Sequence, residues 1–117
     1  MRRFVILSHD HPFPHFDLML EAEAKLRTWR LLGAPTDARD IRAESLGDHR
    51  IDYLEYEGPV SGGRGHVHRW DAGNFEICEQ SPGKLIVQLV GVRCRGTGEL
   101  RCVQGSWTWR WNQSRGD

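Results

Sequence analysis

Apolar and polar residues alternate through much of the chain, as they do in β-strands with one buried face. The alternation is clearest from 15 to 21, where one face carries Phe16, Leu18 and Leu20 and the other carries His15, Asp17, Met19 and Glu21. Apolar or alternating runs predict further strands at 4–7, 66–70, 85–90, 99–103 and 107–111. The chain is therefore expected to fold mostly as β-sheet.

Glycine-rich and polar stretches separate these runs and predict the turns. The longest are a loop at 33–40 and a glycine-rich loop at 58–65. Shorter turns are expected at Asp71-Ala72-Gly73-Asn74, Gly96-Thr97-Gly98 and Gly105-Ser106. Short strands joined by regular turns predict hairpins, and hairpins in series favour an antiparallel sheet.

Helical content is expected to be small. Periodicity does not decide whether 21–30 forms a second strand after a turn or a short helix. Asp48 can cap a brief helical turn that reaches Tyr53, which would place His49 and Tyr53 on one face. We therefore predict a mostly β fold, a compact antiparallel β-barrel with one or two short helical segments. Residues 1–117 form a single domain in this prediction, with 112–117 as a flexible tail.

Three tryptophans share one face of the last predicted strand, at positions 107, 109 and 111. Such a stripe predicts packing in the core of a barrel. The alternative is an exposed platform on which nucleic-acid bases stack. The core interpretation is the more common one for aromatic residues at this spacing, so we expect these rings to be buried.

The charge balance narrows the classes of partner. Lys and Arg together number 16, as do Asp and Glu, so the net charge is zero with neutral histidines. Such a chain does not coat nucleic acid or an anionic membrane through its overall charge, and any phosphate site must be local. No apolar run approaches the roughly 20 residues of a membrane-spanning helix. Cys94 and Cys102 are expected on alternating strands, where a free cysteine packs as a small apolar residue. Three cysteines without a C-x-x-C spacing indicate a reduced, cytoplasmic protein.

The first cluster of candidate chemistry is His15-Phe16-Asp17, preceded by His9. On a strand, His15 and Asp17 project from the same face, and His9 can fold back beside them from the preceding strand. Two imidazoles and one carboxylate suit a divalent transition metal such as Mn, Fe or Zn, with positions open for water or substrate. The alternative is a pair of surface histidines beside a solvated aspartate.

Two further patterns carry weaker chemical signals. His66 and His68 also share a strand face, and with Glu76 downstream they echo the metal motif of cupin barrels, although a solvent-facing pair is the simpler interpretation. The glycine-rich loop at 58–65 could cradle a phosphate through its backbone N–H groups, with Arg64 assisting. A plain hairpin loop is the alternative, because no Walker motif closes it.

Several ordered motifs together resemble one family, the 3′-phosphoesterase domain of bacterial DNA ligase D. His9-Asp10, His15-Phe16-Asp17 and Leu20-Glu21 are similar to its metal-site signature. The segment 48–53 followed by Tyr56-Glu57-Gly58 is similar to its Asp-His-Pro-Leu-Glu-Tyr…Phe-Glu-Gly segment. The stretches 65–73 and 83–98, together with Trp107, resemble its glycine loop, its Trp-Asp-x-Gly turn and its later strands. The resemblance extends from about Phe4 to Trp111.

The resemblance implies a compact β-barrel that binds Mn²⁺, with Zn²⁺ or Co²⁺ as alternatives. It implies removal of 3′-phosphates, or of a terminal ribonucleotide remnant, from DNA ends before they are joined in double-strand-break repair. Carried over by position, His9, His15 and Asp17 would hold the metal, and His49 and Tyr53 would contact the scissile phosphate. Arg42 would be the phosphate-binding arginine that precedes His49. The implied partners are DNA 3′ ends and a separate ligase or polymerase, with the chain acting as a monomer in the cytoplasm at the nucleoid.

One departure from the family bears on catalysis. Met19 stands two residues after Asp17, where the family carries an arginine. A thioether cannot neutralise phosphoryl charge, so Arg42, Arg50 or Arg64 would have to supply it. Two alternatives to the enzyme therefore stay open: a DNA-end or partner-binding module that retains the metal site, and a cupin-like metal enzyme acting on a small organic substrate.

Overall fold

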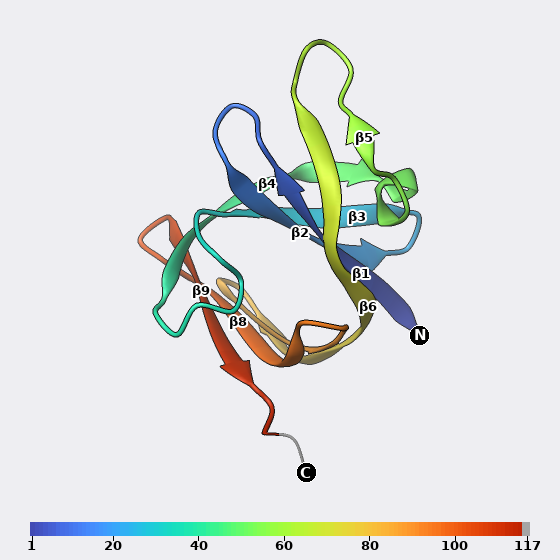
Figure 1. The fold of residues 1–117 in the computed structure, drawn as a ribbon. Coiled ribbons are helices and arrows are strands. Elements are labelled where there is room, and N and C mark those ends of the chain that lie inside the picture. The colour runs from blue at the N-terminus through green and yellow to red at the C-terminus, as the bar shows by residue number, and fades with distance from the viewer. Residues whose placement is uncertain (116–117) are drawn as a thin grey trace.

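The computed structural model describes residues 1–115, and in this range the fold consists of nine strands and one short 3₁₀ helix, drawn in Figure 1. The elements are β1 (Arg2–His9), β2 (His15–Ala22), β3 (Lys25–Leu31), β4 (Ile41–Arg50), η1 (Ile51–Leu54), β5 (Gly58–Pro59), β6 (His66–Ser81), β7 (Lys84–Val90), β8 (Arg95–Val103) and β9 (Ser106–Gln113). No helix in this described part of the chain is long and apolar enough to cross a membrane.

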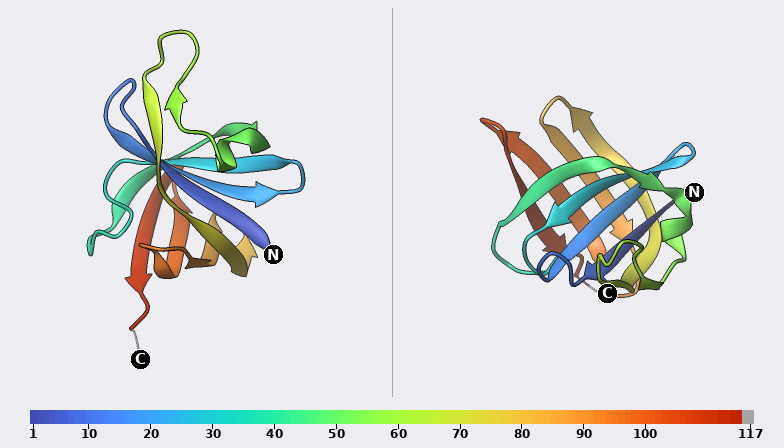
Figure 2. Two further views of the ribbon diagram at one scale, coloured as in Figure 1. Left: turned by 45° about the vertical axis from the view of Figure 1, so that its right-hand side comes forward. Right: turned by 90° about the horizontal axis from the view of Figure 1, so that it is seen from above.

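The strands form one antiparallel sheet that closes on itself. Its order is β1-β2-β3-β4-β9-β8-β7-β6-β5, and β1 also pairs with β6, so eight strands complete a ring and β5 lies outside it against β6. Figure 2 shows the strands surrounding a common interior, with the segment between β4 and β6 on the outside. Closure leaves few unpaired backbone groups at sheet edges. The predicted mostly β, barrel-like antiparallel fold is confirmed.

Residues 21–30, which the sequence left open between strand and helix, form the end of β2, a tight turn and most of β3. Ala22 pairs with Lys25, so only Glu23 and Ala24 make the turn, and Glu23 has the positive φ (59°) that such turns need. The β8–β9 turn is equally tight: Gln104 and Gly105 have φ of 51° and 81°. These turns fix the register of the hairpins they join.

Two predicted turns are wrong, because the glycines that suggested them lie inside strands. The predicted turn at 71–74 is part of β6, and the predicted turn at 96–98 is part of β8. A Cβ on Gly73 would overlap the Val90 carbonyl oxygen, and one on Gly98 would overlap the Trp109 ring. These glycines permit close approach of a neighbouring strand or ring, which is the other reason for glycine in a strand.

Three smaller predictions also need correction. The helical turn expected over Asp48–Tyr53 is shifted, because β4 continues through Arg50 and the 3₁₀ helix begins at Ile51. The predicted tail at 112–117 begins too early, since β9 continues through Gln113; residues 116–117 of that prediction lie outside the described residues. Buried Cys94, expected on a strand, precedes β8 instead.

The strands β1, β2 and β3 bury side chains on both faces. The inner faces contribute to a large cluster inside the ring, which also contains Trp109 and Trp111 and is packed against by Trp107, as the core interpretation expected. The outer faces contribute to a smaller cluster of Val5, Leu7, Met19, Leu26, Leu54 and Val67. Leu54 comes from η1, so the segment between β4 and β6 covers this outer cluster. The candidate site lies beside it.

Candidate metal and phosphate site

Strand register brings the three predicted metal ligands together. His9 ends β1 and His15 begins β2, and the two are directly paired across the strands. Asp17 is two residues further along β2, on the same face as His15 and diagonal to His9. One ligand atom from each residue lies within 4.8 Å of the others. The spacing His-x-Asp after a reversing loop is therefore sufficient to gather the cluster.

A hydrogen bond to a backbone carbonyl determines which ring nitrogen of neutral His15 carries the proton. Its Nδ1–H donates to the Phe13 carbonyl oxygen at 2.8 Å, so the neutral ring carries its lone pair on Nε2. The residue is buried, and its Nε2 lies 3.2 Å from Asp17 Oδ1. Neither of these two atoms has a hydrogen-bond partner within the described part of the chain. Two acceptors therefore face each other in a buried position.

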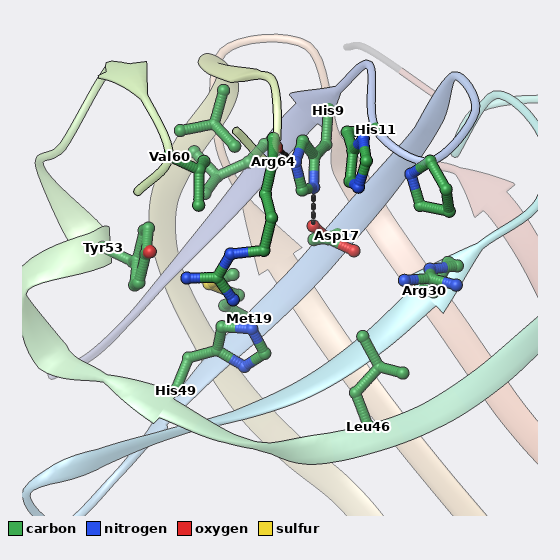
Figure 3. Close-up of a pocket in the computed structure, with 13 residues that line it drawn as sticks. His9, His11, Asp17, Met19, Arg30, Leu46, His49, Tyr53, Val60 and Arg64 are labelled. Carbon is green, nitrogen blue, oxygen red and sulfur yellow. Dashed lines mark hydrogen bonds and ion pairs between the residues drawn. The ribbon is translucent and has the colours of Figure 1, made fainter. Parts of the chain in front are cut away.

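A second carbonyl orients His9 in the same way. Its Nε2–H donates to the Arg64 carbonyl oxygen at 2.9 Å, which leaves a lone pair on Nδ1, 3.3 Å from Asp17 Oδ2. Figure 3 shows this ring aimed at the carboxylate. The glycine-rich loop reaches His9 because Gly65 adopts φ +75°, and a Cβ there would overlap Asp10. The loop is held in place by a hydrogen bond from the His66 N–H to Asp10 Oδ1 at 2.7 Å.

The donor set fits a divalent cation. Lone pairs from His9 Nδ1 and His15 Nε2 converge on a carboxylate, and only a cation or a proton between them relieves the repulsion of three acceptors. Two nitrogens and a carboxylate are the ligand types of Mn²⁺, Fe²⁺ and Zn²⁺ sites. The predicted triad can thus hold a metal ion, and the two carbonyls act as the groups that orient its histidines.

Asp17 and the Phe13 carbonyl oxygen also favour the charged form of His15. Burial opposes the imidazolium, but the hydrogen bonds that the imidazolium would donate to these two groups, together with the charge of Asp17, outweigh that effect, so the pKa of His15 is raised above its ordinary value. Protons and metal ions therefore compete for the same nitrogen. The electrostatics of the site attract positive charge in either form.

A cavity of about 210 Å³ opens beside the triad, on the outer face of the ring. His9 and Asp17 line it together with residues from β3, β4, η1 and the glycine-rich loop: Arg30, Leu46, His49, Tyr53, Val60 and Arg64. Figure 3 shows Arg64 reaching from the loop toward Tyr53 and His49. The cavity thus combines a candidate metal site with cationic and hydrogen-bonding groups suited to a phosphate.

His49 and Tyr53 meet here by a route different from the predicted one. His49 is on β4 and Tyr53 on η1, and their rings make an edge contact with centroids 5.7 Å apart. His49 Nδ1–H donates to the Gly47 carbonyl oxygen at 3.0 Å, which leaves Nε2 as the atom available to a ligand. Arg42 does not join them: it lies at the other end of β4, paired with Thr108 of β9, and does not line the cavity.

Two residues that line this cavity, Arg30 and His11, were not predicted from the sequence. Arg30 lies on β3 directly opposite Asp17. A two-residue turn at 23–24 would have predicted that pairing, because hairpin register follows from turn length. His11 comes from the loop between β1 and β2, and its ring centroid is 6.5 Å from that of His9. No periodic signal marks a loop residue of this kind.

The cupin-like grouping is not formed. His66 and His68 are exposed on β6, where their Nδ1 atoms lie 3.9 Å from Asp10 Oδ2 and Glu57 Oε2 respectively. Glu76 is further along the strand, paired with Gln88 of β7. Among residues 1–115, the cluster of His9, His15 and Asp17 is the group of three or more side chains placed to hold a metal ion.

Comparison with known proteins identifies the family of this chain. The profile of the DNA Ligase D 3′-phosphoesterase domain matches residues 7–101. The multifunctional non-homologous end joining DNA repair protein LigD of Mycobacterium tuberculosis is 30% identical over 117 residues, covering 92% of this chain and 15% of that protein. LigD of Pseudomonas aeruginosa is 30% identical over 108 residues, covering 84% and 13%. The chain thus spans about a seventh of the length of these relatives. The resemblance in the sequence is confirmed, and the chain belongs to the DNA ligase D 3′-phosphoesterase domain family.

Proposed function

We propose that the chain is a metal-dependent phosphoesterase that removes 3′-phosphates, or the remnant of a 3′-terminal ribonucleotide, from DNA ends during double-strand-break repair. The observation that carries the proposal is the convergence of three acceptor groups, from His9, His15 and Asp17, on one edge of a cavity lined by cationic and phenolic side chains. Family membership supports the reaction class. A terminal phosphate is small enough for such a cavity, whereas a continuous duplex is not.

The triad would hold the divalent ion through His9 Nδ1, His15 Nε2 and an Asp17 carboxylate oxygen. When bound, a divalent cation supplies charge neutralisation at the phosphoryl group and lowers the pKa of water. The Phe13 and Arg64 carbonyl oxygens keep the two imidazoles in the tautomers that this role requires. We propose Mn²⁺ as the ion, with Zn²⁺ or Co²⁺ as alternatives that the same ligands accept.

His49, Tyr53 and Arg64 would bind the phosphoryl oxygens across the cavity from the triad. His49 Nε2 can donate to a phosphoryl oxygen when protonated, or pass its proton to the leaving 3′-oxygen. The Tyr53 hydroxyl can donate to a second oxygen. Arg64 is held by Ser61, whose carbonyl accepts from Nε at 2.7 Å and whose Oγ accepts from Nη2 at 3.2 Å. That anchoring limits how far its guanidinium can move.

The proposed partners follow from this chemistry. A net charge of zero and a local cationic cavity suit a protein that contacts the end of a strand and few other phosphates, so binding to DNA ends should depend weakly on salt. The relatives are described as multifunctional end-joining proteins, and we propose that a separate ligase or polymerase supplies the remaining steps. The proposed location is the cytoplasm at the nucleoid, with the protein acting as a monomer.

The proposal is tested with a DNA primer that ends in a 3′-phosphate. Incubation with the protein and Mn²⁺ should yield the 3′-hydroxyl primer, resolved by gel electrophoresis. His15→Ala removes one ligand and should abolish the product, whereas Arg101→Gln on β8, on the far side of the ring, should leave it unchanged. A wild-type protein that binds Mn²⁺ and releases no phosphate would refute the enzymatic proposal.

Met19 favours a second candidate function, a DNA-end-binding module. Its buried thioether lines the cavity, where it supplies no charge to a transition state. Met19→Arg distinguishes the two candidates, provided that circular dichroism shows a folded variant. A weak enzyme should hydrolyse the primer faster with the added guanidinium. A binding module should bind 3′-phosphate ends and gain no hydrolysis.

A further inference from the structure

Arg30 is a second cation at the candidate site, and neither the sequence motifs nor the family resemblance assign it a role. It lies on β3 directly opposite Asp17 and projects from the same outer face of the sheet. It lines the same cavity as His49, Tyr53 and Arg64. Figure 3 shows Arg30 on one side of Asp17 and Arg64 on the other. Two guanidinium groups therefore flank the space in front of the triad.

The guanidinium of Arg30 is held by two contacts, but not all of its hydrogen-bond donors have acceptors. Its Nη1 donates to Glu44 Oε1 at 3.4 Å, across the β3–β4 pair, and its Cζ lies 5.6 Å from the centroid of the Phe13 ring. Its Nε is buried and has no hydrogen-bond partner among residues 1–115. A buried donor without an acceptor is unfavourable, and most such donors in native proteins find a partner.

The unpartnered atoms gather at this site. Of the four buried side-chain nitrogen and oxygen atoms without a partner in residues 1–115, three belong to His15, Asp17 and Arg30. The His15 and Asp17 atoms are acceptors, which a bound cation would satisfy. The Arg30 atom is a donor, which a bound anion would satisfy. A cation and an anion bound side by side would satisfy all three, as a metal ion and a phosphoryl group do.

We propose that Arg30 donates through Nε to an oxygen of the terminal phosphate, binding that group from the side opposite Arg64. Arg30 thereby supplies positive charge at a cavity in which Met19 contributes none. Glu44 and Phe13 position the guanidinium, so the hydrogen bond forms with little loss of side-chain freedom. The inference rests on the proposed function, since it takes the ligand to be a phosphate ester.

The test measures anion and cation binding separately on the full chain. Inorganic phosphate is titrated into metal-free protein and followed by NMR at the arginine Nε–H signals, with Arg30→Gln used to assign the Arg30 signal. That signal should shift on phosphate addition, and Arg30→Gln should weaken phosphate binding by about tenfold, the ratio expected for one charge-assisted hydrogen bond. Mn²⁺ binding, measured by electron paramagnetic resonance, should be unchanged or tighter in the variant, because a repelling charge is removed.

Two controls separate this role from a structural one. Glu44→Gln breaks the cross-strand pair that helps to position Arg30, so it should weaken phosphate binding by less than Arg30→Gln does. Arg101→Gln removes an equal charge from β8 and should bind phosphate within about twofold of wild type. If Arg30 only supports the fold, its loss should weaken phosphate and Mn²⁺ binding together. That result would overturn the inference, as would equal losses in Glu44→Gln or the absence of any phosphate-dependent shift at Arg30.

The phosphate-binding test of Arg30 can succeed or fail whether or not the protein hydrolyses the primer. A wild-type protein that hydrolyses no primer, while its Arg30 signal responds to phosphate, would refute the enzymatic proposal and keep the anion site. Conversely, hydrolysis by wild type with an unchanged KM in Arg30→Gln, together with unchanged phosphate affinity, would keep the enzyme and remove Arg30 from its site.

Discussion

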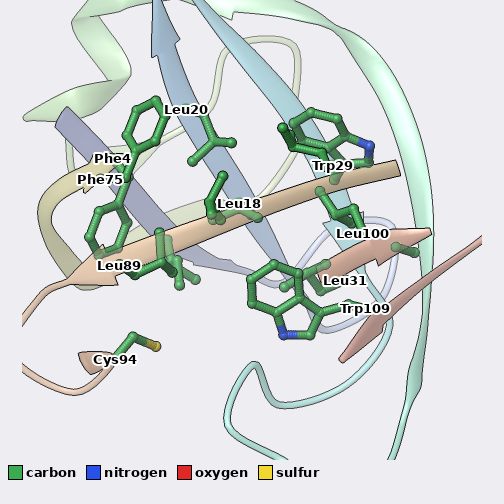
Figure 4. Close-up of a cluster of buried hydrophobic side chains, with 14 of the residues drawn as sticks. Phe4, Leu18, Leu20, Trp29, Leu31, Phe75, Leu89, Cys94, Leu100 and Trp109 are labelled. Carbon is green, nitrogen blue, oxygen red and sulfur yellow. The ribbon is translucent and has the colours of Figure 1, made fainter. Parts of the chain in front are cut away.

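The inner and outer faces of β1, β2 and β3 are built from alternate residues of the same strands, and their composition differs sharply. Inside the ring these strands present mainly apolar side chains, which Figure 4 shows packed with Trp109 and Leu100 from the opposite wall. Outside, the same strands carry an apolar half, under η1, and an ionisable half, which holds His9, Asp17 and Arg30. Adjacent residues of one strand therefore have different roles: one packs in the core, and the next faces the outer cluster or the candidate site.

This difference shows how a small ring of strands can accommodate a reactive site. Eight strands close around a packed interior, so the outer face does not need to be apolar for the sheet to be stable. A single covering segment, residues 51–65, then buries part of the outer face, orients His9 through the Arg64 carbonyl oxygen and leaves a cavity beside the triad. Neighbouring residues such as Asp17 and Leu18 should therefore give unrelated phenotypes when changed.

The largest effect is expected on the inner face. Trp109→Ala removes a fully buried ring and its hydrogen bond to the Pro35 carbonyl oxygen, and it should lower the free energy of unfolding by about 3–5 kcal/mol. Val60→Ala shortens a half-buried side chain that lines the outer cavity and should lower the free energy of unfolding by about 1 kcal/mol. Urea denaturation measures both. Equal losses in the free energy of unfolding would contradict the claim that stability depends mainly on the inner face.

A smaller effect on stability, with a larger one on the site, is expected for Gly65→Ala. The new Cβ would overlap Asp10 and press on His11 in a backbone with positive φ, which moves the Arg64 carbonyl oxygen away from His9. Gly63→Ala is the matched control, because it has a similar φ of +67° with nothing within 4 Å of the added Cβ. The positive φ should cost both variants about 1 kcal/mol of stability, and Gly65→Ala should lose more because its Cβ displaces Asp10 and His11. Only Gly65→Ala should weaken Mn²⁺ binding; similar Mn²⁺ affinities in the two variants would show that the loop does not orient His9.

The pH dependence of stability should also distinguish the site from exposed histidines. Because the folded state raises the pKa of His15, metal-free protein gains stability from it that is complete below the ordinary histidine value of about 6.5. That contribution is lost as pH rises through the raised pKa. Urea denaturation across this range should show the decline in wild type and in His68→Gln, but not in His15→Gln. Parallel profiles for all three proteins would contradict the raised pKa.

The smallest expected effect is a difference in thiol reactivity. Burial, and then the neighbouring Asp71 carboxylate, raise the pKa of the Cys94 thiol to about 12, whereas Cys78 is exposed on β6. Iodoacetamide at neutral pH should label Cys78 in the native protein and Cys94 only after unfolding, as read by peptide mass spectrometry. Early labelling of Cys94 would show that the inner face opens readily.

Much of this arrangement was predictable from local patterns. Apolar and alternating runs located β1, β2, β7, β8, β9 and the first part of β6, but they did not predict β4. The spacing of His15 and Asp17 placed both on one face before any tertiary information. The two wrong turns share one cause, since Gly73 and Gly98 serve close packing against another strand rather than a reversal. A single sequence does not distinguish these uses of glycine, because the atoms that require it are distant along the chain.

The rest of the site depended on long-range pairing. Arg30 faces Asp17 only because the β2–β3 turn has two residues, and the sequence left that turn undecided between strand and helix. Arg42 was selected by family resemblance, yet β4 is long enough to carry it away from His49 to the β9 side of the ring. Strand length and register, which accumulate over several elements, therefore decide which arginines reach the cavity.

The central claim is that His9, His15 and Asp17 form a metal site rather than a structural cluster, and binding of Mn²⁺ to Asp17→Asn tests it most directly. The substitution conserves shape and removes the charge on which the two lone pairs converge. Titration followed by electron paramagnetic resonance should show one tight Mn²⁺ site in wild type and at least about 100-fold weaker binding in the variant. Metal-free wild type and variant should unfold at similar urea concentrations. Equal Mn²⁺ affinities, or a variant that loses its fold without metal, would contradict the account.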